Sequence, residues 1–177
     1  MNMTQPDTDH GGIVVSGGGV CEPLVAPRMT FAFECRDAEG NLRWSETVEN
    51  LVTTAGKTDL IDKYLKGSAY TAAWYLLLMG TGTPAVGDTL ASHAGWSEVT
   101  PYTGNRPSIT WGTTASGSNT ASAVSITINA TATVAGAGCC TAATGTSGVL
   151  YNAALFASSR SVVSGDTLAV TVTLSAT

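Results

Sequence analysis

The stretch from residue 107 to residue 159 contains no Asp, Glu, Lys or Arg over 53 consecutive positions. Thr, Ser, Ala and Gly fill it, around short segments in which apolar residues alternate, such as Val124, Ile126 and Ile128. Such alternation places one face of a strand in a core and the other in solvent. Many short strands separated by Gly, Ser and Asn favour a β-sandwich or barrel.

Two explanations for the missing charges remain open. The strands can form a sheet whose Thr and Ser hydroxyls are solvated, or copies of the chain or another subunit can cover them. Uncharged sheet edges tend to pair with one another, and an isolated monomer would normally carry charges there. We therefore favour the second explanation, in which these strands belong to a docking surface.

The first half of the chain predicts a hairpin and one helix. Residues 30–36 and 42–48 are rich in strand-forming residues and flank the turn cluster 37–41. We expect Thr54 to cap a helix that ends at Gly67, since glycine is typical just after a helix. Apolar residues at helical spacing define one side of this helix: Leu60, Ile61, Tyr64 and Leu65. Charged residues are expected on its solvated face: Lys57, Asp59, Asp62, Lys63 and Lys66.

Further strands are expected at residues 72–79, 108–111, 123–128, 131–134, 148–156 and 168–174. Residues 131–134 are expected to pair with 123–128 across a tight turn, and 80–96 form a long loop. The sequence Gly-Asp-Thr-Leu occurs at 87–90 and again at 165–168. In both copies we expect the Asp to hydrogen-bond nearby backbone in a turn that leads into a strand.

The length of 177 residues suits a single domain. We predict a mainly β fold, an immunoglobulin-like or jelly-roll-like β-sandwich with one short α-helix, over residues 28–177. Residues 1–27 are glycine-rich and are expected to form an extended N-terminal arm, with an apolar cluster at Ile13, Val14 and Val15. Two alternatives stay open for this arm: a disordered tail, or a segment that becomes ordered on a neighbouring subunit.

The composition argues against several classes of partner. The net charge is −5 and the pI about 4.8, so the clustered cations that bind nucleic acid are missing, and an anionic membrane is not favoured. The apolar run 72–79 is too short to span a bilayer, and the N-terminus does not resemble a signal peptide. We therefore expect assembly in the cytoplasm.

Residues suited to chemistry are few. Asp88, His93 and Glu98 share one segment, with Ser92 beside His93, but their spacing fits no metal signature and adjacent side chains point apart. We expect Asp88 to stabilise a turn, His93 to bond loop backbone and Trp96 to act as an aromatic anchor. The sequence predicts no enzyme, no cofactor, and no catalytic or metal-binding residue. The cysteines are expected to be free, buried thiols: Cys21, Cys35, Cys139 and Cys140.

Three segments resemble a family of small virion proteins of tailed bacteriophages, and the resemblance covers roughly residues 30–175. They are Glu-Asn-Leu-Val-Thr-Thr-Ala-Gly at 49–56, the run Asp-Thr-Leu-Ala-Ser-His-Ala-Gly-Trp-Ser-Glu at 88–98, and Ser-Gly-Asp-Thr-Leu-Ala-Val-Thr at 164–171. Arg106-Pro107 and Thr110-Trp111-Gly112 belong to the same pattern. The β-rich build and small size are also similar to capsid cement proteins.

This resemblance implies a structural protein of the virion. The leading expectation is a cement or decoration protein on the capsid exterior that binds the major capsid protein and stabilises the shell, and that is itself a dimer or trimer. Its expected subunit interface comprises Ile13, Val14, Val15, His93, Trp96 and Arg106. The alternative is a tail, neck or fibre component that binds a host receptor or glycan, and a hydrolase is a third class.

Overall fold

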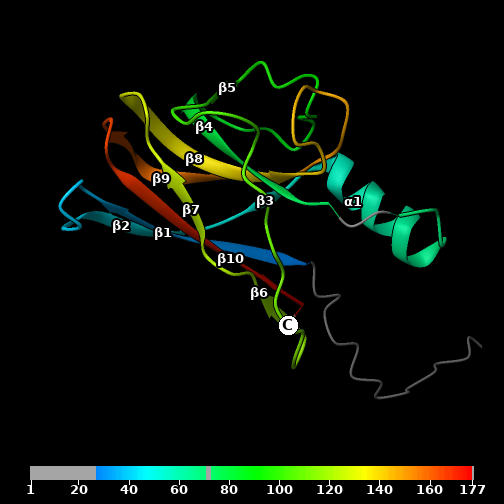
Figure 1. Ribbon diagram of the computed structural model, residues 1–177. Helices are drawn as coiled ribbons and strands as arrows, with labels where there is room; N and C mark the ends of the chain where they lie inside the picture. The colour runs from blue at the N-terminus through cyan, green and yellow to red at the C-terminus, as the bar shows by residue number, and fades with distance from the viewer. Residues whose placement is uncertain (1–26, 71–72, 177) are drawn as a thin grey trace, which may run out of the picture.

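The computed structural model describes residues 27–70 and 73–176, which form two antiparallel sheets packed face to face with one short helix at the side (Figure 1). The predicted mainly β sandwich is therefore confirmed. Of the predicted arm, residues 1–26 lie outside the described residues. They include the expected interface residues Ile13, Val14 and Val15.

The first sheet has the strand order β2-β1-β10-β6, and β7 also pairs with β10. Its strands are β1 (Arg28–Arg36), β2 (Leu42–Glu49), β6 (Ser118–Thr120), β7 (Val124–Thr127) and β10 (Thr167–Ser175). The predicted hairpin is confirmed as β1 and β2. Its turn is held by Asp37, whose carboxylate accepts the backbone N–H groups of Glu39 and Asn41.

The second sheet has the order β3-β9-β8-β4-β5. Its strands are β3 (Leu51–Val52), β4 (Tyr75–Gly82), β5 (Trp96–Val99), β8 (Ala132–Cys140) and β9 (Leu150–Val162). The apolar run expected at 72–79 becomes the inner strand β4, which begins at Tyr75. Both faces of this sheet are covered, which explains why β4 and β8 are buried along almost continuous runs.

The main core lies between the sheets. Alternate residues of β1 and β10 point into it, including Phe31, Phe33, Val170 and Val172, all at most 1% exposed. A smaller core lies on the outer face of the second sheet, where the loop from 83 to 95 and the residues after β8 cover Leu77 and Met79. The covering of β8 and β9 by the chain itself accounts for much of the uncharged stretch without a partner. It does not explain the uncharged character of the edge strands β6 and β7, which each pair only with β10.

The helical segment consists of α1 (Thr54–Leu60) followed by a π-helical turn, η1 (Ile61–Leu65). The cap is Thr53 and not Thr54 as predicted, since the buried Thr53 hydroxyl accepts the Gly56 N–H at 3.0 Å. The predicted end is confirmed, because Gly67 has a φ of +69°.

The orientation of the helix differs from the prediction. Gly56 faces β9, so that a Cβ there would lie 2.3 Å from the Tyr151 carbonyl oxygen. This close approach turns the apolar side of the helix outward, and Tyr64 and Leu65 are 82% and 72% exposed. Asp59 and Lys63, which were expected on the solvated face, are half-buried, whereas the apolar residues of the helix are exposed.

Three other predictions were wrong. Residues 131–134 do not pair with 123–128, because the chain crosses between the sheets at 129–130, where β7 pairs with β10 and β8 with β9 and β4. Residues 108–111 make only isolated bridges, at Ser108 and Trp111. The turn at 87–90 is followed by loop, whereas its copy at 165–168 does lead into a strand, β10.

Candidate functional site

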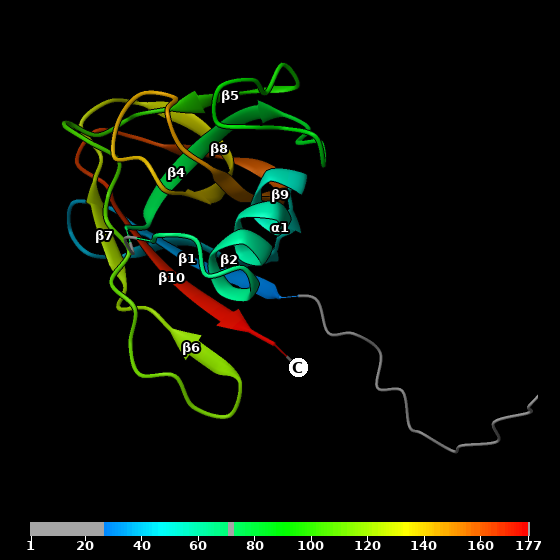
Figure 2. The ribbon, with the colours of Figure 1, turned by 90° about the vertical axis from the view of Figure 1, so that its right-hand side faces the viewer.

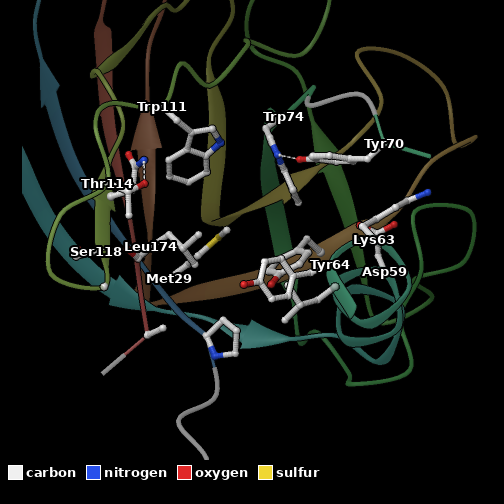
Figure 3. A pocket seen from close by; sticks show the side chains of 16 residues that line it. Met29, Asp59, Lys63, Tyr64, Tyr70, Trp74, Trp111, Thr114, Ser118 and Leu174 are labelled. Atoms are coloured by element: carbon white, nitrogen blue, oxygen red, sulfur yellow. Dashed lines mark hydrogen bonds between the residues drawn. The ribbon is translucent and has the colours of Figure 1, made fainter. Parts of the chain in front are cut away.

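The helical segment lies beside the end of the first sheet where β1 starts and β10 ends (Figure 2). A half-open groove of about 560 Å³ lies between them (Figure 3). Its size is within the range of ligand pockets. Its walls are mainly apolar and aromatic: Pro27, Met29, Leu60, Tyr64, Tyr70, Trp74, Trp111, Tyr151, Leu174 and Ala176. Polar residues at its margins include Asp59, Lys63, Thr114, Ser118 and Asn119.

Trp74 is held in the groove by one hydrogen bond and one aromatic contact. Its indole N–H donates a hydrogen bond to the Tyr70 hydroxyl at 2.9 Å, and its ring meets that of Tyr151 edge to face with centroids 5.2 Å apart (Figure 3). Burial raises the pKa of Tyr151, and the negative charge of Asp59 adds to this, so its phenol is neutral at physiological pH. Trp74 and Tyr151 therefore give the groove an uncharged, aromatic floor.

The opposite wall comes from the loop between Trp111 and β6. Asn119 holds this loop, because its side-chain N–H₂ donates to the Gly112 carbonyl at 3.0 Å and to the Thr114 hydroxyl at 2.8 Å. Gly117 adopts φ +72° at the tip and packs near the Ala176 carbonyl. The wall is thus built by two segments far apart in sequence, so that no local motif could reveal it.

The groove continues onto an exposed apolar side of the helix. Leu60 and Tyr64 line the groove, and Ile61 and Leu65 extend the surface outward with exposures of 50% and 72%. We call these four residues the apolar stripe. The sequence showed the spacing of the stripe but not its exposure. The available clue was Gly56, since a glycine within a helix indicates a side of close backbone approach.

The expected interface residues His93, Trp96 and Arg106 lie elsewhere, in the outer layer over the second sheet. The Trp96 indole N–H donates to Asp88 at 2.8 Å, and the His93 ring stacks on Trp96 with centroids 4.0 Å apart. His93 Nδ1 lies 3.1 Å from the Trp96 carbonyl oxygen. The structural roles predicted for Asp88, His93 and Trp96 are confirmed. Their role at an interface stays a prediction.

Arg106 is 9% exposed, and its guanidinium is hydrogen-bonded to groups of the same chain. Its guanidinium makes two hydrogen bonds to the Glu98 carboxylate, at 2.7 and 2.6 Å, and donates to the carbonyls of Ala142 and Gly145. The bond to Glu98 is the main cause that raises the pKa of Arg106. This pair ties β5 to the loop after β8, which is a structural task.

The candidates for acid–base chemistry do not converge. The Asp88 carboxylate binds Trp96 and the backbone of Ala85, Glu98 binds Arg106, and His93 faces a backbone carbonyl. Within the described residues, no group of three His, Cys, Asp or Glu side chains is placed to hold a metal ion.

The described cysteines are free and buried, as predicted: Cys35, Cys139 and Cys140. Burial raises the pKa of the Cys35 thiol to about 11, and the neighbouring Asp166 adds to the effect. Burial also raises the pKa of Cys139 and Cys140. Thiols of this kind stay protonated and are poor nucleophiles at neutral pH. Cys21 lies outside the described residues.

No helix in the described part of the chain has the length and apolar character needed to cross a membrane. Comparison with known proteins gave no match to any family model and none to any curated protein.

Proposed function

We propose that this protein is a non-enzymatic docking protein of a tailed-phage virion, a cement or decoration protein that binds the major capsid protein on the outside of the shell. The observation that carries the docking role is the apolar surface formed by the groove and the apolar stripe. The phage assignment is supported by the sequence resemblance at residues 49–56, 88–98 and 164–171.

The chemistry of this surface suits a protein partner. Contiguous exposed apolar patches on soluble domains are typical of interaction sites. Binding energy at protein interfaces concentrates in Trp and Tyr residues held in well-packed positions, and Trp74 is such a residue. Tyr64, which is 82% exposed, gains most from being covered.

A cement function follows from mass action. A protein that binds the assembled shell and not its separated subunits stabilises the shell, and the stabilisation grows as its free concentration exceeds its dissociation constant. A domain with rigid sheets and an exposed apolar surface fits this task, because little conformational entropy is lost on docking. The proposal includes self-association to a dimer or trimer, with the uncharged edge strand β7 as the candidate contact.

The test is occupancy on capsids. Tyr64→Ser and Leu65→Ser remove exposed apolar side chains and should leave the fold intact while occupancy on purified shells falls at least several-fold. Leu42→Ser is the matched control, since Leu42 is also exposed, at 53%, but lies at the far end of β1 from the groove. Equal occupancy of all three variants and the unchanged protein would refute a docking role for this surface.

A second candidate function is glycan binding by a tail, neck or fibre component. The observation that favours it is the combination of Trp74, Trp111 and Tyr70 with polar Asn119 and Asp59 in one groove, since sugars stack on aromatic rings and need hydrogen bonds at their edges. Calorimetry with host surface glycans tests it. Imaging the virion separates the two candidates, because a cement protein follows the capsid lattice and a tail component does not.

A further inference from the structure

Asp59 brings a negative charge into the wall of the groove. It lies three residues after Gly56, the glycine that approaches β9, and therefore on the same side of α1. Asp59 is half-buried, and within the described residues its carboxylate takes part in no hydrogen bond and no salt bridge. Asp62, the other acid of the helical segment, pairs with Lys66 at 2.9 Å. Because partial burial of an uncompensated charge costs free energy, Asp59 has an unused capacity to bind a cation.

Lys63 does not neutralise Asp59, although it follows four residues later and also lines the groove. Its ammonium donates to the Ala69 carbonyl at 2.9 Å and forms no salt bridge with Asp59. In Figure 3 the Lys63 nitrogen points outward, away from Trp74 and Trp111. A cation from outside therefore reaches Asp59 along the aromatic side of the groove.

Aromatic rings surround this approach. The charge of Asp59 contributes to the raised pKa of Tyr151, whose ring meets Trp74 with centroids 5.2 Å apart, so these three side chains lie together. Tyr70 accepts the Trp74 indole N–H, and Tyr64 comes from the turn that follows Asp59 (Figure 3). The faces of Trp and Tyr rings attract cations, and more strongly where water is excluded. The groove thus combines an unpaired carboxylate with aromatic rings.

We propose that the groove binds an arginine side chain of a protein partner, with the guanidinium on Asp59 and against the rings of Tyr70 and Trp74. A guanidinium forms two parallel hydrogen bonds to a carboxylate and stacks on aromatic rings. It is also more weakly hydrated than the lysine ammonium, which suits a mainly apolar groove. The aliphatic stem of the arginine packs along apolar lining residues such as Leu60.

The occupant belongs to a protein because the groove opens onto the apolar stripe. Leu60 and Tyr64 are part of both, so an arginine in the groove is one residue of a larger surface that covers the stripe. Arginine is enriched, together with Trp and Tyr, among the residues that dominate binding at protein interfaces. That this partner is the major capsid protein rests on the proposed function, whereas the chemistry of the groove does not.

The test uses the full chain and the peptide acetyl-Gly-Leu-Arg-Gly-amide. Its control is the same peptide with citrulline, which has the shape of arginine without the charge. Each peptide is titrated at low salt while NMR follows the indole N–H signals of Trp74 and Trp111. We expect the arginine peptide to bind roughly three- to ten-fold more tightly than the citrulline peptide. Added salt should reduce this difference, because the groove is half-open and the charges are screened.

Three variants assign the preference to Asp59. Asp59→Asn keeps the shape of the side chain and should abolish the preference for arginine over citrulline. Asp62→Asn is the matched control, since it removes an equal charge from the same helical segment at a residue that does not line the groove. It should keep the preference. Lys63→Gln removes a competing cation and should strengthen arginine binding several-fold. Circular dichroism shows whether each variant is folded.

Equal binding of the two peptides, including no binding of either, would overturn the inference. An arginine preference that survives Asp59→Asn would do the same. If Asp59→Asn does not fold, Lys63→Gln decides, because arginine binding that is unchanged or weaker contradicts a cation site at Asp59. Shifts of both indole signals with a host glycan and none with the arginine peptide would assign the groove to glycans.

The peptide titrations contain no capsids, so their failure leaves docking through the apolar stripe standing. Conversely, Asp59-dependent arginine binding together with undiminished capsid occupancy of Tyr64→Ser and Leu65→Ser would remove the proposed function and leave the arginine site standing.

Discussion

The indole N–H of Trp96 donates a hydrogen bond to the carboxylate of Asp88 at 2.8 Å, with both residues buried. Asp88 also accepts the backbone N–H of Ala85, three residues before it. Asp166 accepts the N–H of Val163 in the same way. The two Gly-Asp-Thr-Leu segments therefore build one kind of turn, closed by the Asp side chain, and in each the carboxylate anchors a second element through Trp96 or Arg43.

Replacing Trp96 by Phe should lower the free energy of unfolding by about 1–3 kcal/mol, because a buried carboxylate loses a donor. Urea unfolding followed by circular dichroism measures the change. Ser97→Ala, in the adjacent exposed position, is the control and should change stability little. A Trp96→Phe protein as stable as the unchanged one would show that this bond contributes nothing net.

Gly56→Ala should destabilise the protein by about 1–3 kcal/mol through overpacking, even though Ala favours helix. The new Cβ would lie 2.3 Å from the Tyr151 carbonyl oxygen, so α1 must move away from β9. Gly87→Ala is the matched control, since a Cβ there meets nothing within 4 Å. Thermal unfolding of the two variants compares them directly, and a stabilised Gly56→Ala would contradict the close packing of helix and strand.

Stability should fall at alkaline pH through Cys35. Its pKa is raised to about 11 in the folded protein from the usual 9.0, so the folded state holds this proton more tightly than the unfolded chain does. The stabilisation is complete below about pH 9 and is lost as the pH rises to about 11. In Cys35→Ala the unfolding free energy should depend less steeply on pH over this range. Parallel pH profiles for the two proteins would argue against this assignment.

The self-association proposed above should weaken when β7 carries a charge. Thr127 is exposed on this edge strand, and lysine on an edge disfavours pairing with another strand. Thr127→Lys should lower the mass measured by light scattering over a range of concentrations. Ser45→Lys, on the edge strand β2 that already carries Arg43 and Glu46, should leave the mass unchanged. If Thr127→Lys keeps the full oligomeric mass, β7 is not the contact.

Several elements were predictable because local signals coincide. Alternating residues on both sides of the cluster 37–41 specify the hairpin β1–β2, since the turn fixes both partners and register. The spacing from Leu168 to Val172 predicts the buried face of β10 in the same way. The positive φ of Gly67 explains why the helix end was also predictable. In each case, residues near in sequence decide the structure.

The pairing of 131–134 and the face of the helix were not predictable, for one physical reason. Apolar alternation states that a strand has a buried face, but not which of two sheets buries it. Helical spacing likewise defines an apolar side without stating whether the chain covers it. Gly56 against Tyr151, two residues 95 positions apart in the sequence, settles the orientation of α1.

The sequence by itself thus determined a β-sandwich with one short helix, free thiols and a chain poor in groups for chemistry. Only the tertiary structure decided that β8 and the uncharged first part of β9 are largely covered by the chain itself, and that Trp96 and Arg106 are bound within it. It also created the groove, because Met29, Tyr64, Trp74 and Trp111 come from distant segments. Alternation and spacing are local properties, whereas a groove depends on which surfaces remain uncovered after the sheets have packed.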